Sequence, residues 1–314
     1  MKSTLARIIF ILLAVTLIAA LFYNYSIPNR EVIVTIPQGS SGKTIADTLY
    51  DNRLITNKGL FMFFSNLNGS AKKFQSGTYK LNQKMDMFKI MDLLRKGRIY
   101  SIKTTIPEGF TAEQVAALLE QKGLANSGKF LEIVKKQNLE GYLFPETYFI
   151  PFGSKEQAIV NIMTGEFRKK FATDMEDQAK KQKMNTRSAV ILASIIEKET
   201  VLPEERALVS GIFQNRLKKG WMLESCSTVR YAKKKFAGKL TYKDIKFDSP
   251  YNTYRHQGLP PGPICNPGIA SIEAALNPAQ TDLMFFFSEG DGTHEFSKYY
   301  KQHIEKQKTL KKKQ

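Results

Sequence analysis

A short segment occurs twice in this chain, and this repeat constrains the fold more than any other feature. Residues 34–57 (VTIPQGSSGKTIADTLYDNRLITN) align in register with residues 104–127 (TTIPEGFTAEQVAALLEQKGLANS). Each copy predicts a strand, a Pro/Gly turn and a helix, which starts near Lys43 in the first copy and near Thr111 in the second. Residues between the copies add a strand and a helix from about Met87 to Arg95. Because a solenoid needs at least about three repeats, the pattern predicts small duplicated α/β modules.

An apolar run, Ile8–Tyr23, follows Lys2 and Arg7 near the N-terminus. Basic residues before such a run and aromatic residues at its far end predict a membrane segment with its N-terminus in the cytoplasm and the remainder exported. A cleaved signal peptide is the alternative, but no A-x-A pattern precedes Leu21. We therefore expect residues 1–29 to form a cytoplasmic stub and a single-pass anchor in the inner (cytoplasmic) membrane.

The chain has 314 residues and a formal net charge of +18. An exported chain rarely meets nucleic acid, so we expect no nucleic-acid partner and favour an anionic membrane surface or a cell-wall polymer. The sequence favours neither a disulfide between Cys226 and Cys265 nor two free thiols, since two cysteines do not make a disulfide scaffold.

Residues 188–200 (SAVILASIIEKET) predict an apolar helix that ends in two glutamates. Helical spacing places Glu199 on the same stripe as Leu192 and Ile195, and places Glu197 on the opposite, less apolar side. We therefore expect Glu199 to be largely desolvated and Glu197 to be exposed or ion-paired. Burial disfavours the charged form of a carboxyl group, which suits a general acid. The structural alternative is a glutamate at the edge of a core helix, paired with Lys or Arg.

A second candidate site lies in the loop at residues 249–268 (SPYNTYRHQGLPPGPICNPG). Its prolines fix φ and its glycines permit tight turns, so the loop can be rigid without regular hydrogen bonding. We expect this loop to form the wall of a groove that holds a sugar. The alternative is that it is a structural cross-over loop. The residues that we expect to bind substrate are Tyr251, Asn252, Thr253, Tyr254, Pro261, Asn266 and, from a later segment, His294.

Several motifs, taken in order, resemble the YceG/MltG family of endolytic murein transglycosylases. They are ASIIEKET, FQNRL, SPYNTY, GLPPGPI with NPG, and DGTHEF followed by His303. The resemblance covers nearly everything after the apolar run, including GYLFPETY. It implies a LysM-like region before a catalytic domain, and it implies that Glu199 is the catalytic glutamate.

One segment departs from the family pattern. Relatives typically read LQSDPTV, whereas this chain has LESCSTV at residues 223–229. Cys226 and Ser227 thus replace an Asp-Pro pair, which leaves any role of that aspartate open. Glu224 replaces a glutamine and is a candidate for a nearby carboxylate.

The resemblance implies cleavage of the β-1,4 bond between N-acetylmuramic acid and N-acetylglucosamine. Glu199 would protonate the glycosidic oxygen, and the C6 hydroxyl of the sugar would attack to leave a 1,6-anhydro end. The implied partners are peptidoglycan glycan strands and cell-wall synthases. Two alternatives stay open: a muramidase that hydrolyses the same bond, and a non-catalytic glycan-binding scaffold.

No cofactor or metal is expected, because His256, His294 and His303 match neither H-E-x-x-H nor C-x-x-C spacing. We expect an α+β chain in three parts. These are the anchor at residues 1–29, LysM-like α/β modules at residues 30–137, and a lysozyme-like, mainly helical catalytic domain at residues 138–314.

Overall fold

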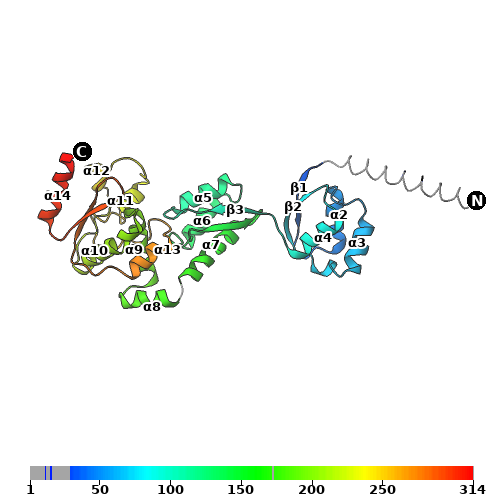
Figure 1. Cartoon of the computed structure of the whole chain (residues 1–314), viewed down its shortest axis with the longest axis horizontal. Coiled ribbons are helices and arrows are strands. Elements are labelled where there is room, and N and C mark those ends of the chain that lie inside the picture. Colours follow the sequence, from blue (N-terminus) through cyan, green and yellow to red (C-terminus); the bar gives the residue numbers. More distant parts are fainter. Residues whose placement is uncertain (1–10, 12–14, 16–28, 172, 314) are drawn as a thin grey trace, which may run out of the picture. The chain divides into compact units, whose positions relative to one another are not determined.

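The computed structural model describes residues 11, 15, 29–171 and 173–313, which fold into two compact units (Figure 1). The smaller unit ends at Ile102 and also takes in Pro151–Gly153, and the larger unit contains Lys103–Ile150 and Ser154–Gln314. Apart from residues 11 and 15, the predicted anchor lies outside the described residues. Within the described part, none of the helices combines the length and the apolar character needed to cross a membrane.

The smaller unit packs three helices against one antiparallel pair of strands, in which Glu31 faces Asn82 and Ile36 faces Gly77. Side chains that accept a hydrogen bond from a first-turn amide begin all three helices, which explains where they start. Leu49, Phe61 and Tyr79 are fully buried in the core. The elements are β1 (Glu31–Ile36), α2 (Gly42–Asp51), α3 (Lys58–Leu67), the 3₁₀ turn η1 (Ala71–Lys73), β2 (Gly77–Asn82) and α4 (Met87–Lys96).

The second copy of the repeat forms the same strand–turn–helix arrangement as the first, so the predicted duplication is confirmed at the level of elements. Its helix begins after Thr111, which forms a capping box with Gln114. The helices that follow pack on one another, and the strands β3 and β4 form a second two-stranded sheet. The elements are β3 (Ser101–Thr105), α5 (Ala112–Gln121), α6 (Ser127–Lys136), β4 (Thr147–Pro151) and α7 (Glu156–Lys170).

The division between the compact units lies at residues 102/103, whereas we expected a domain boundary at residues 137/138. The second copy therefore belongs to the larger unit. The reason is visible at its turn, where the Gly109 amide donates to the carbonyl of Asn266 and the Asn266 amide donates to the carbonyl of Phe110.

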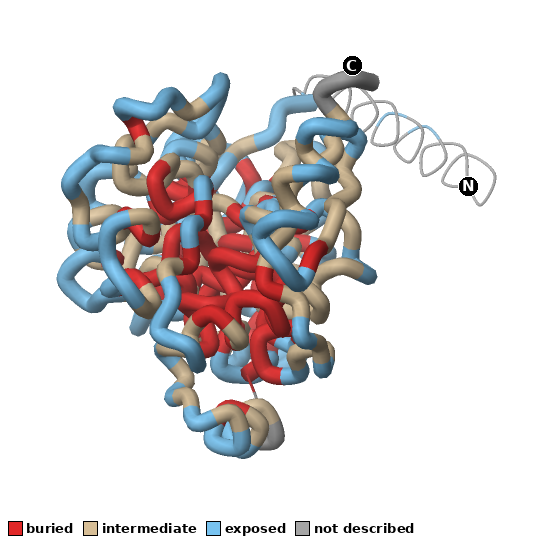
Figure 2. Tube along the Cα trace, turned by 90° about the vertical axis from the view of Figure 1, so that its left-hand side faces the viewer, coloured by how far each residue is buried: buried red, intermediate tan, exposed pale blue. Residues whose placement is uncertain are grey.

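In the rest of the larger unit, α9 packs against α8, α10, α11 and α13 (Figure 1). Figure 2 shows the buried segments of this unit gathered inside exposed loops and helix ends. A short antiparallel hairpin, in which Phe285 faces Ser297, completes the unit with the C-terminal helix. The elements are α8 (Thr173–Lys181), α9 (Thr186–Glu199), η2 (Pro203–Glu205), α10 (Arg206–Lys218), α11 (Cys226–Lys233), α12 (Tyr242–Ile245), α13 (Ile269–Leu276), β5 (Phe285–Ser288), β6 (His294–Ser297) and α14 (Tyr300–Lys313).

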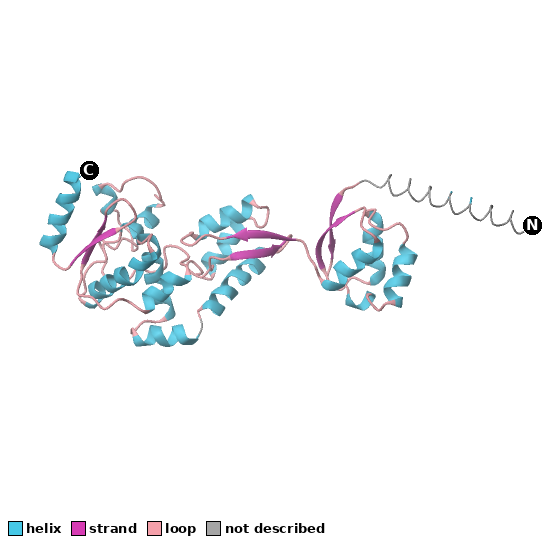
Figure 3. Ribbon diagram, viewed as in Figure 1, coloured by secondary structure: helices cyan, strands magenta, loops and turns pink. Residues whose placement is uncertain are grey.

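The described chain is thus α+β, mainly helical with three separate two-stranded sheets, as Figure 3 shows. This agrees with the predicted class. The one-sided burial predicted for residues 188–200 is wrong, because every residue of Ala189–Ile196 is buried. The helix has neighbours on several sides and so lies in the centre of the unit instead of at its surface.

Candidate active site

Glu199 is the last residue of α9, and its carboxyl group is held by two hydrogen bonds. The Ser225 hydroxyl donates to Oε1, and the Ser227 amide donates to the same oxygen over 3.2 Å. The side chain is half-buried and lines a cavity of about 600 Å³. Glu199 is therefore less desolvated than we expected, but it is fixed in place and open to a ligand.

The cavity around Glu199 is lined mostly by aromatic and ionisable side chains. The walls come from the end of α9, from α10, from the segment before α11, from the β5–β6 hairpin and from α14. Aromatic faces beside polar groups suit a sugar ring, which presents both apolar C–H faces and hydroxyl groups. Besides Glu199, the lining residues are Val201, Arg216, Glu224, Cys226, Tyr254, Phe285, Phe286, Phe287, Ser288, Gly292, His294, Tyr300, His303 and Gln307.

A second carboxylate, Glu224, lines the same cavity and pairs with Arg216 over 3.4 Å. Arg216 is nearly buried and also donates to the carbonyls of Leu223 and Met284 over 2.7 and 2.8 Å. Burial lowers the pKa of its guanidinium, and the charges of Glu224 and Glu199 oppose that shift. Glu224 is half-exposed and has a left-handed φ of 50°, so the backbone turns sharply just before Ser225.

Ser225 is positioned by Thr253 of the SPYNTY motif. The Ser225 amide donates to the Thr253 hydroxyl over 3.0 Å, and the Glu224 amide donates to the Thr253 carbonyl over 3.1 Å. The Thr228 hydroxyl lies 2.9 Å from that of Thr253. Thr253 is itself buried. It therefore acts on Glu199 through Ser225, and not by touching a ligand as we expected.

Of the predicted substrate-binding residues, Tyr254 and His294 line the cavity beside Glu199. The Tyr254 hydroxyl lies 3.1 Å from Cys226 Sγ, and burial raises its pKa. The backbone amide of His294 donates to the carboxylate of Glu205, and its Nδ1 lies 2.6 Å from the same carboxylate. His294 is thus both a wall residue and a structural one.

Asn252 is fully buried and does not line the cavity. Its side-chain amide donates to the carbonyls of Ile245 and Phe247, and its oxygen accepts from the Tyr254 amide. All of its polar side-chain atoms are engaged within the loop. The structure therefore gives Asn252 the role of holding the loop in shape, and its replacement by alanine would act on the fold.

Asn266, Tyr251 and Pro261 also lie outside the cavity lining. The buried Asn266 oxygen accepts from the amides of Gly141 and Leu143, each over 2.9 Å, and its nitrogen donates to the carbonyl of Phe110. Its role is to join the second repeat copy to the rest of the larger unit.

The Tyr251 ring packs 5.0 Å from that of Tyr231, and the Pro261 carbonyl accepts from Arg187 over 2.8 Å. The rigid backbone of this loop predicted that it forms the wall of a groove. In the structure, however, many of its polar groups bond to other protein groups and do not face the cavity.

Glu197 is the more enclosed of the two glutamates, with 8% of its side chain exposed. It accepts hydrogen bonds from the Gly268 amide and the Ser271 hydroxyl and lies 3.9 Å from Arg206. Of the two alternatives predicted for Glu197, an ion pair or an exposed side chain, the structure has the ion pair with Arg206. Its carboxylate faces the start of α13 and is absent from the cavity lining.

His303 contributes a ring to the cavity wall, 5.4 Å from Phe285, and burial lowers the pKa of its imidazole, with a smaller effect from Arg216. The question left open for the cysteines is settled, because Cys226 is exposed, Cys265 is buried and both are free. In the described ranges no three His, Cys, Asp or Glu groups come together as a metal site would require.

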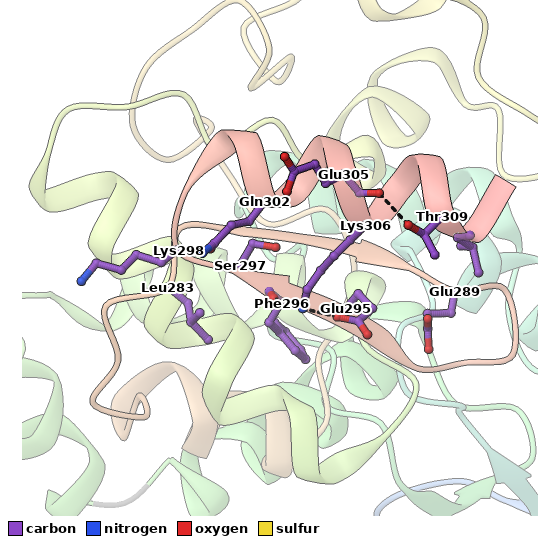
Figure 4. Close-up of a pocket in the computed structure, with 11 residues that line it drawn as sticks. Leu283, Glu289, Glu295, Phe296, Ser297, Lys298, Gln302, Glu305, Lys306 and Thr309 are labelled. Atoms are coloured by element: carbon purple, nitrogen blue, oxygen red, sulfur yellow. Dashed lines mark hydrogen bonds and ion pairs between the residues drawn. The ribbon is translucent and has the colours of Figure 1, made fainter. Parts of the chain in front are cut away.

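A second cavity of about 510 Å³ lies between β6 and α14 (Figure 4). Lys306 reaches across it to the Glu295 carboxylate and to the Phe296 carbonyl. Tyr300 and His303 of α14 also line the cavity of Glu199, so this helix borders both cavities. Neither Glu199 nor Ser225 lines the second cavity.

Sequence reasoning missed Ser225, Arg216 and the aromatic wall of the hairpin. Arg216 stands in FQNRL, and Ser225 stands in LESCSTV. Arg216 falls on the same helical stripe as Ile212 and Phe213, and a charge on an apolar stripe could have pointed to it, because buried charges are paired. No local signal identifies Ser225, since its contact with Glu199 joins two distant segments.

Comparison with known proteins identifies the family. The model of the YceG-like family matches residues 34–309. The endolytic murein transglycosylase of Bacillus subtilis (strain 168) is 34% identical over 303 residues, covering 88% of this chain and 83% of the relative. That of Streptococcus pneumoniae serotype 2 is 27% identical and covers 83% of this chain but only 55% of the relative.

A solved structure agrees with these matches. The crystal structure of a yceG-like protein from Listeria monocytogenes has a TM-score of 0.60 and 31% identity, and the match covers 88% of this chain and 99% of that one. The expected resemblance is therefore confirmed. The chain is a member of the YceG-like family.

Proposed function

We propose that the chain is an endolytic lytic transglycosylase that cleaves the bond between N-acetylmuramic acid and N-acetylglucosamine in peptidoglycan and leaves 1,6-anhydro ends. The observation that carries the proposal is Glu199, a carboxyl group fixed by Ser225 and Ser227 at the wall of an aromatic cavity. The family supports it, because the relatives named above are endolytic murein transglycosylases. The chain is thus an enzyme of the lytic transglycosylase kind.

In this reaction Glu199 acts first as an acid and then as a base. Its proton goes to the glycosidic oxygen, which leaves as the bond breaks and charge develops at the anomeric carbon of the muramic acid. The C6 hydroxyl of that sugar then attacks the carbon and returns a proton to the Glu199 carboxylate. The Ser225 hydroxyl and the Ser227 amide stabilise the ionised carboxylate between the two steps.

A muramidase is the second candidate, and Glu224 is the observation that favours it. Hydrolytic glycosidases usually pair two carboxylates about 5–9.5 Å apart, one of which activates water or attacks the sugar. Glu224 lines the same cavity as Glu199 and lies 3.4 Å from Arg216. Glu224→Gln would then abolish cleavage in a muramidase but spare most of it in a transglycosylase.

We further propose that the enzyme works at the outer face of the inner membrane, where it would terminate glycan strands made by cell-wall synthases. The apolar run Ile8–Tyr23 after Lys2 and Arg7 supports this location, and the net charge of +18 suits anionic glycan and lipid.

The test is mass spectrometry of the muropeptides released from purified sacculi. Anhydro ends are expected from the parent protein, whereas reducing ends would indicate the muramidase. Glu199→Gln should lower release by at least ~10²–10⁴-fold, because the amide keeps the shape but cannot exchange the proton.

Glu197→Gln is the matched control, since Glu197 faces α13 and not the cavity. It should cost much less. Near-parental release of anhydro-muropeptides by Glu199→Gln, with an unchanged circular dichroism spectrum, would rule out the assignment of Glu199.

A further inference from the structure

Helix α3 of the smaller unit is apolar on its outward face as well as on its inward face. Phe61 and Ser65 are buried against the core of the unit. On the other side, Leu60, Phe63 and Leu67 are 51, 59 and 72% exposed. Their spacing of three and four residues places them on one stripe. A soluble helix normally has polar residues on this side, so the exposed stripe requires an explanation.

The stripe continues onto the neighbouring helix α4. Phe64 is half-buried beside Phe63, with ring centroids 5.3 Å apart, and its other neighbour is Phe88 at 5.2 Å. Phe88 is 53% exposed. We call these residues the α3 apolar face: Leu60, Phe63, Phe64, Leu67 and Phe88. Three aromatic rings and two leucines on one surface form a contiguous patch instead of scattered exposed residues.

The charge of the unit around this face is positive. Residues 30–102 contain twelve Lys and Arg but five Asp and Glu. Exposed Lys72 and Lys73 lie in the 3₁₀ turn after α3, and exposed Lys89 follows Phe88. The two carboxylates of α4 and its cap are already engaged, because Asp86 caps the helix and Asp92 pairs with Arg95 and Lys96. Aromatic and leucine side chains next to lysines are typical of a surface that enters the headgroup layer of an anionic bilayer.

The position of the apolar run in the sequence favours a lipid surface as the occupant. Tyr23 ends the run, and β1 begins at Glu31. Eight residues span at most roughly 28 Å when fully extended. A unit of this size is itself roughly 30 Å across. If the run is a membrane anchor, the unit cannot move farther from the bilayer than about its own diameter, so its surface meets lipid repeatedly.

We propose that the α3 apolar face inserts into the interfacial layer of an anionic membrane and lays the smaller unit on the lipid surface. This inference rests on the membrane location proposed above, but not on the chemistry of Glu199. Docking through α3 would fix the distance of the smaller unit from the membrane and limit its rotation about the segment between Tyr23 and Glu31.

The test uses the full chain reconstituted into vesicles of phosphatidylcholine with a minority of phosphatidylglycerol and a trace of diazirine-bearing phosphatidylcholine. After irradiation, trypsin releases residues 59–72 (GLFMFFSNLNGSAK), which carry most of the α3 apolar face. Residues 44–53 (TIADTLYDNR), which include exposed Tyr50, serve as the internal reference. Lipid adducts should be about tenfold more abundant on the first peptide, because its large apolar side chains would be buried in lipid and Tyr50 would not.

The double variant Phe63→Ser, Leu67→Ser should reduce that labelling about tenfold. Both side chains are largely exposed, so the fold should survive, as an unchanged thermal melt would verify. Phe149→Ser is the matched control, because Phe149 is 68% exposed but lies on β4. It should leave the labelling of residues 59–72 unchanged. Both the double variant and Phe149→Ser should release muropeptides from added glycan at the parental rate.

Three results would overturn the inference. If the chain floats with the vesicles but both peptides are labelled equally, the anchor stands and the docking does not. If the chain does not float with the vesicles, the anchor fails and the docking fails with it, while the activity of Glu199 is measured separately on glycan. If residues 59–72 carry no lipid adducts and the detergent-solubilised chain elutes as a dimer that the double variant does not form, the α3 apolar face is a dimer interface.

Discussion

Ser225 connects Glu199, the proposed acid, to the rest of the larger unit. Its hydroxyl donates to Glu199, and its amide is held by Thr253. A hydrogen bond to a charged group contributes about 1.5–3 kcal/mol, and each 1.4 kcal/mol changes a rate tenfold. Ser225→Ala should therefore lower the release of anhydro-muropeptides about tenfold or more with little loss of stability.

Ser227→Ala is the matched control for this prediction. Ser227 contacts Glu199 through its backbone amide, so the loss of its hydroxyl leaves that hydrogen bond in place. Rates measured on the same sacculi should fall for Ser225→Ala and change little for Ser227→Ala. Equal rates for the two variants would show that the Ser225 hydroxyl has no part in the reaction.

Glu140 gives a pH dependence of stability. Burial raises the pKa of this carboxyl group to about 8, and the charge of Glu113 adds to the effect. Between about pH 4.5, where the unfolded chain loses this proton, and pH 8, the folded chain binds the proton and the unfolded chain does not. The free energy of unfolding therefore falls as the pH rises through this window, by at most about 1.4 kcal/mol per pH unit.

Glu140→Gln should remove that slope, because the amide does not titrate. The variant should gain stability relative to the parent between pH 5 and pH 8 and lose none of that gain above it. Urea unfolding at several pH values measures the difference, and comparing the two proteins cancels the other titrating groups. Parallel curves for the two proteins would contradict the raised pKa.

At the scale of single residues, the sequence indicated Glu199 as a candidate but not the roles of its neighbours. Glu199 was named by its motif and by helical spacing. The same spacing placed Glu197 on a polar side, where the structure has it almost buried. Asn252 and Asn266 have the amide side chains expected of a sugar site, but these side chains form hydrogen bonds with backbone groups inside the fold. Residue type indicates what a side chain can bind, whereas only the fold decides which partner it meets.

Elements were easier to predict than their surroundings. The starts of α2 and α5 follow from hydroxyl caps that are visible in the sequence. The burial of α9 on all sides could not be predicted, because it depends on α10, α11 and α13, which follow later in the chain. Alanine and serine among its apolar residues allow these helices to approach, but they also resemble a weakly polar face.

Asn266 gives a prediction at the scale of elements, since it joins the turn before α5 to the segment after α6. Asn266→Ala would leave the buried amides of Gly141 and Leu143 without an acceptor. Each unsatisfied buried amide costs about 1–3 kcal/mol, so with two of them the larger unit should lose about 2–6 kcal/mol. Gly141 has a φ of 89°, and a Cβ there would lie 2.5 Å from Pro263, so only glycine fits this turn beside Asn266.

Asn277→Ala is the matched control, because Asn277 is exposed and its amide donates to Gln178 and to the Glu273 carbonyl. Urea unfolding should show a loss for Asn266→Ala that is at least about twice that for Asn277→Ala. If the two variants unfold alike, the clamp formed by Asn266 does not stabilise the unit.

At the scale of the whole molecule, the repeat predicted two similar modules but not where each would belong. The two copies have the same order of elements, yet the first forms the smaller unit and the second is built into the larger one. The difference arises from long-range contacts such as those of Asn266 with Phe110 and Gly109. Sequence similarity between copies carries no information about which surfaces they cover.

This division makes a prediction about fragments. Residues 103–314 retain most of β3, all of α5 and α6, and Glu199, so this fragment should fold and release anhydro-muropeptides from sacculi in solution. Residues 138–314 lack Phe110 and the amide of Ala112, which donates to Glu140, so they leave buried polar groups of the catalytic part unpaired. This shorter fragment should be unfolded or much less stable, as circular dichroism and urea unfolding would show. An active fragment 103–314 would also exclude the non-catalytic scaffold, because the smaller unit would be absent. An active, stable fragment 138–314 would instead mean that the second repeat copy is dispensable and that its contacts with Asn266 contribute little.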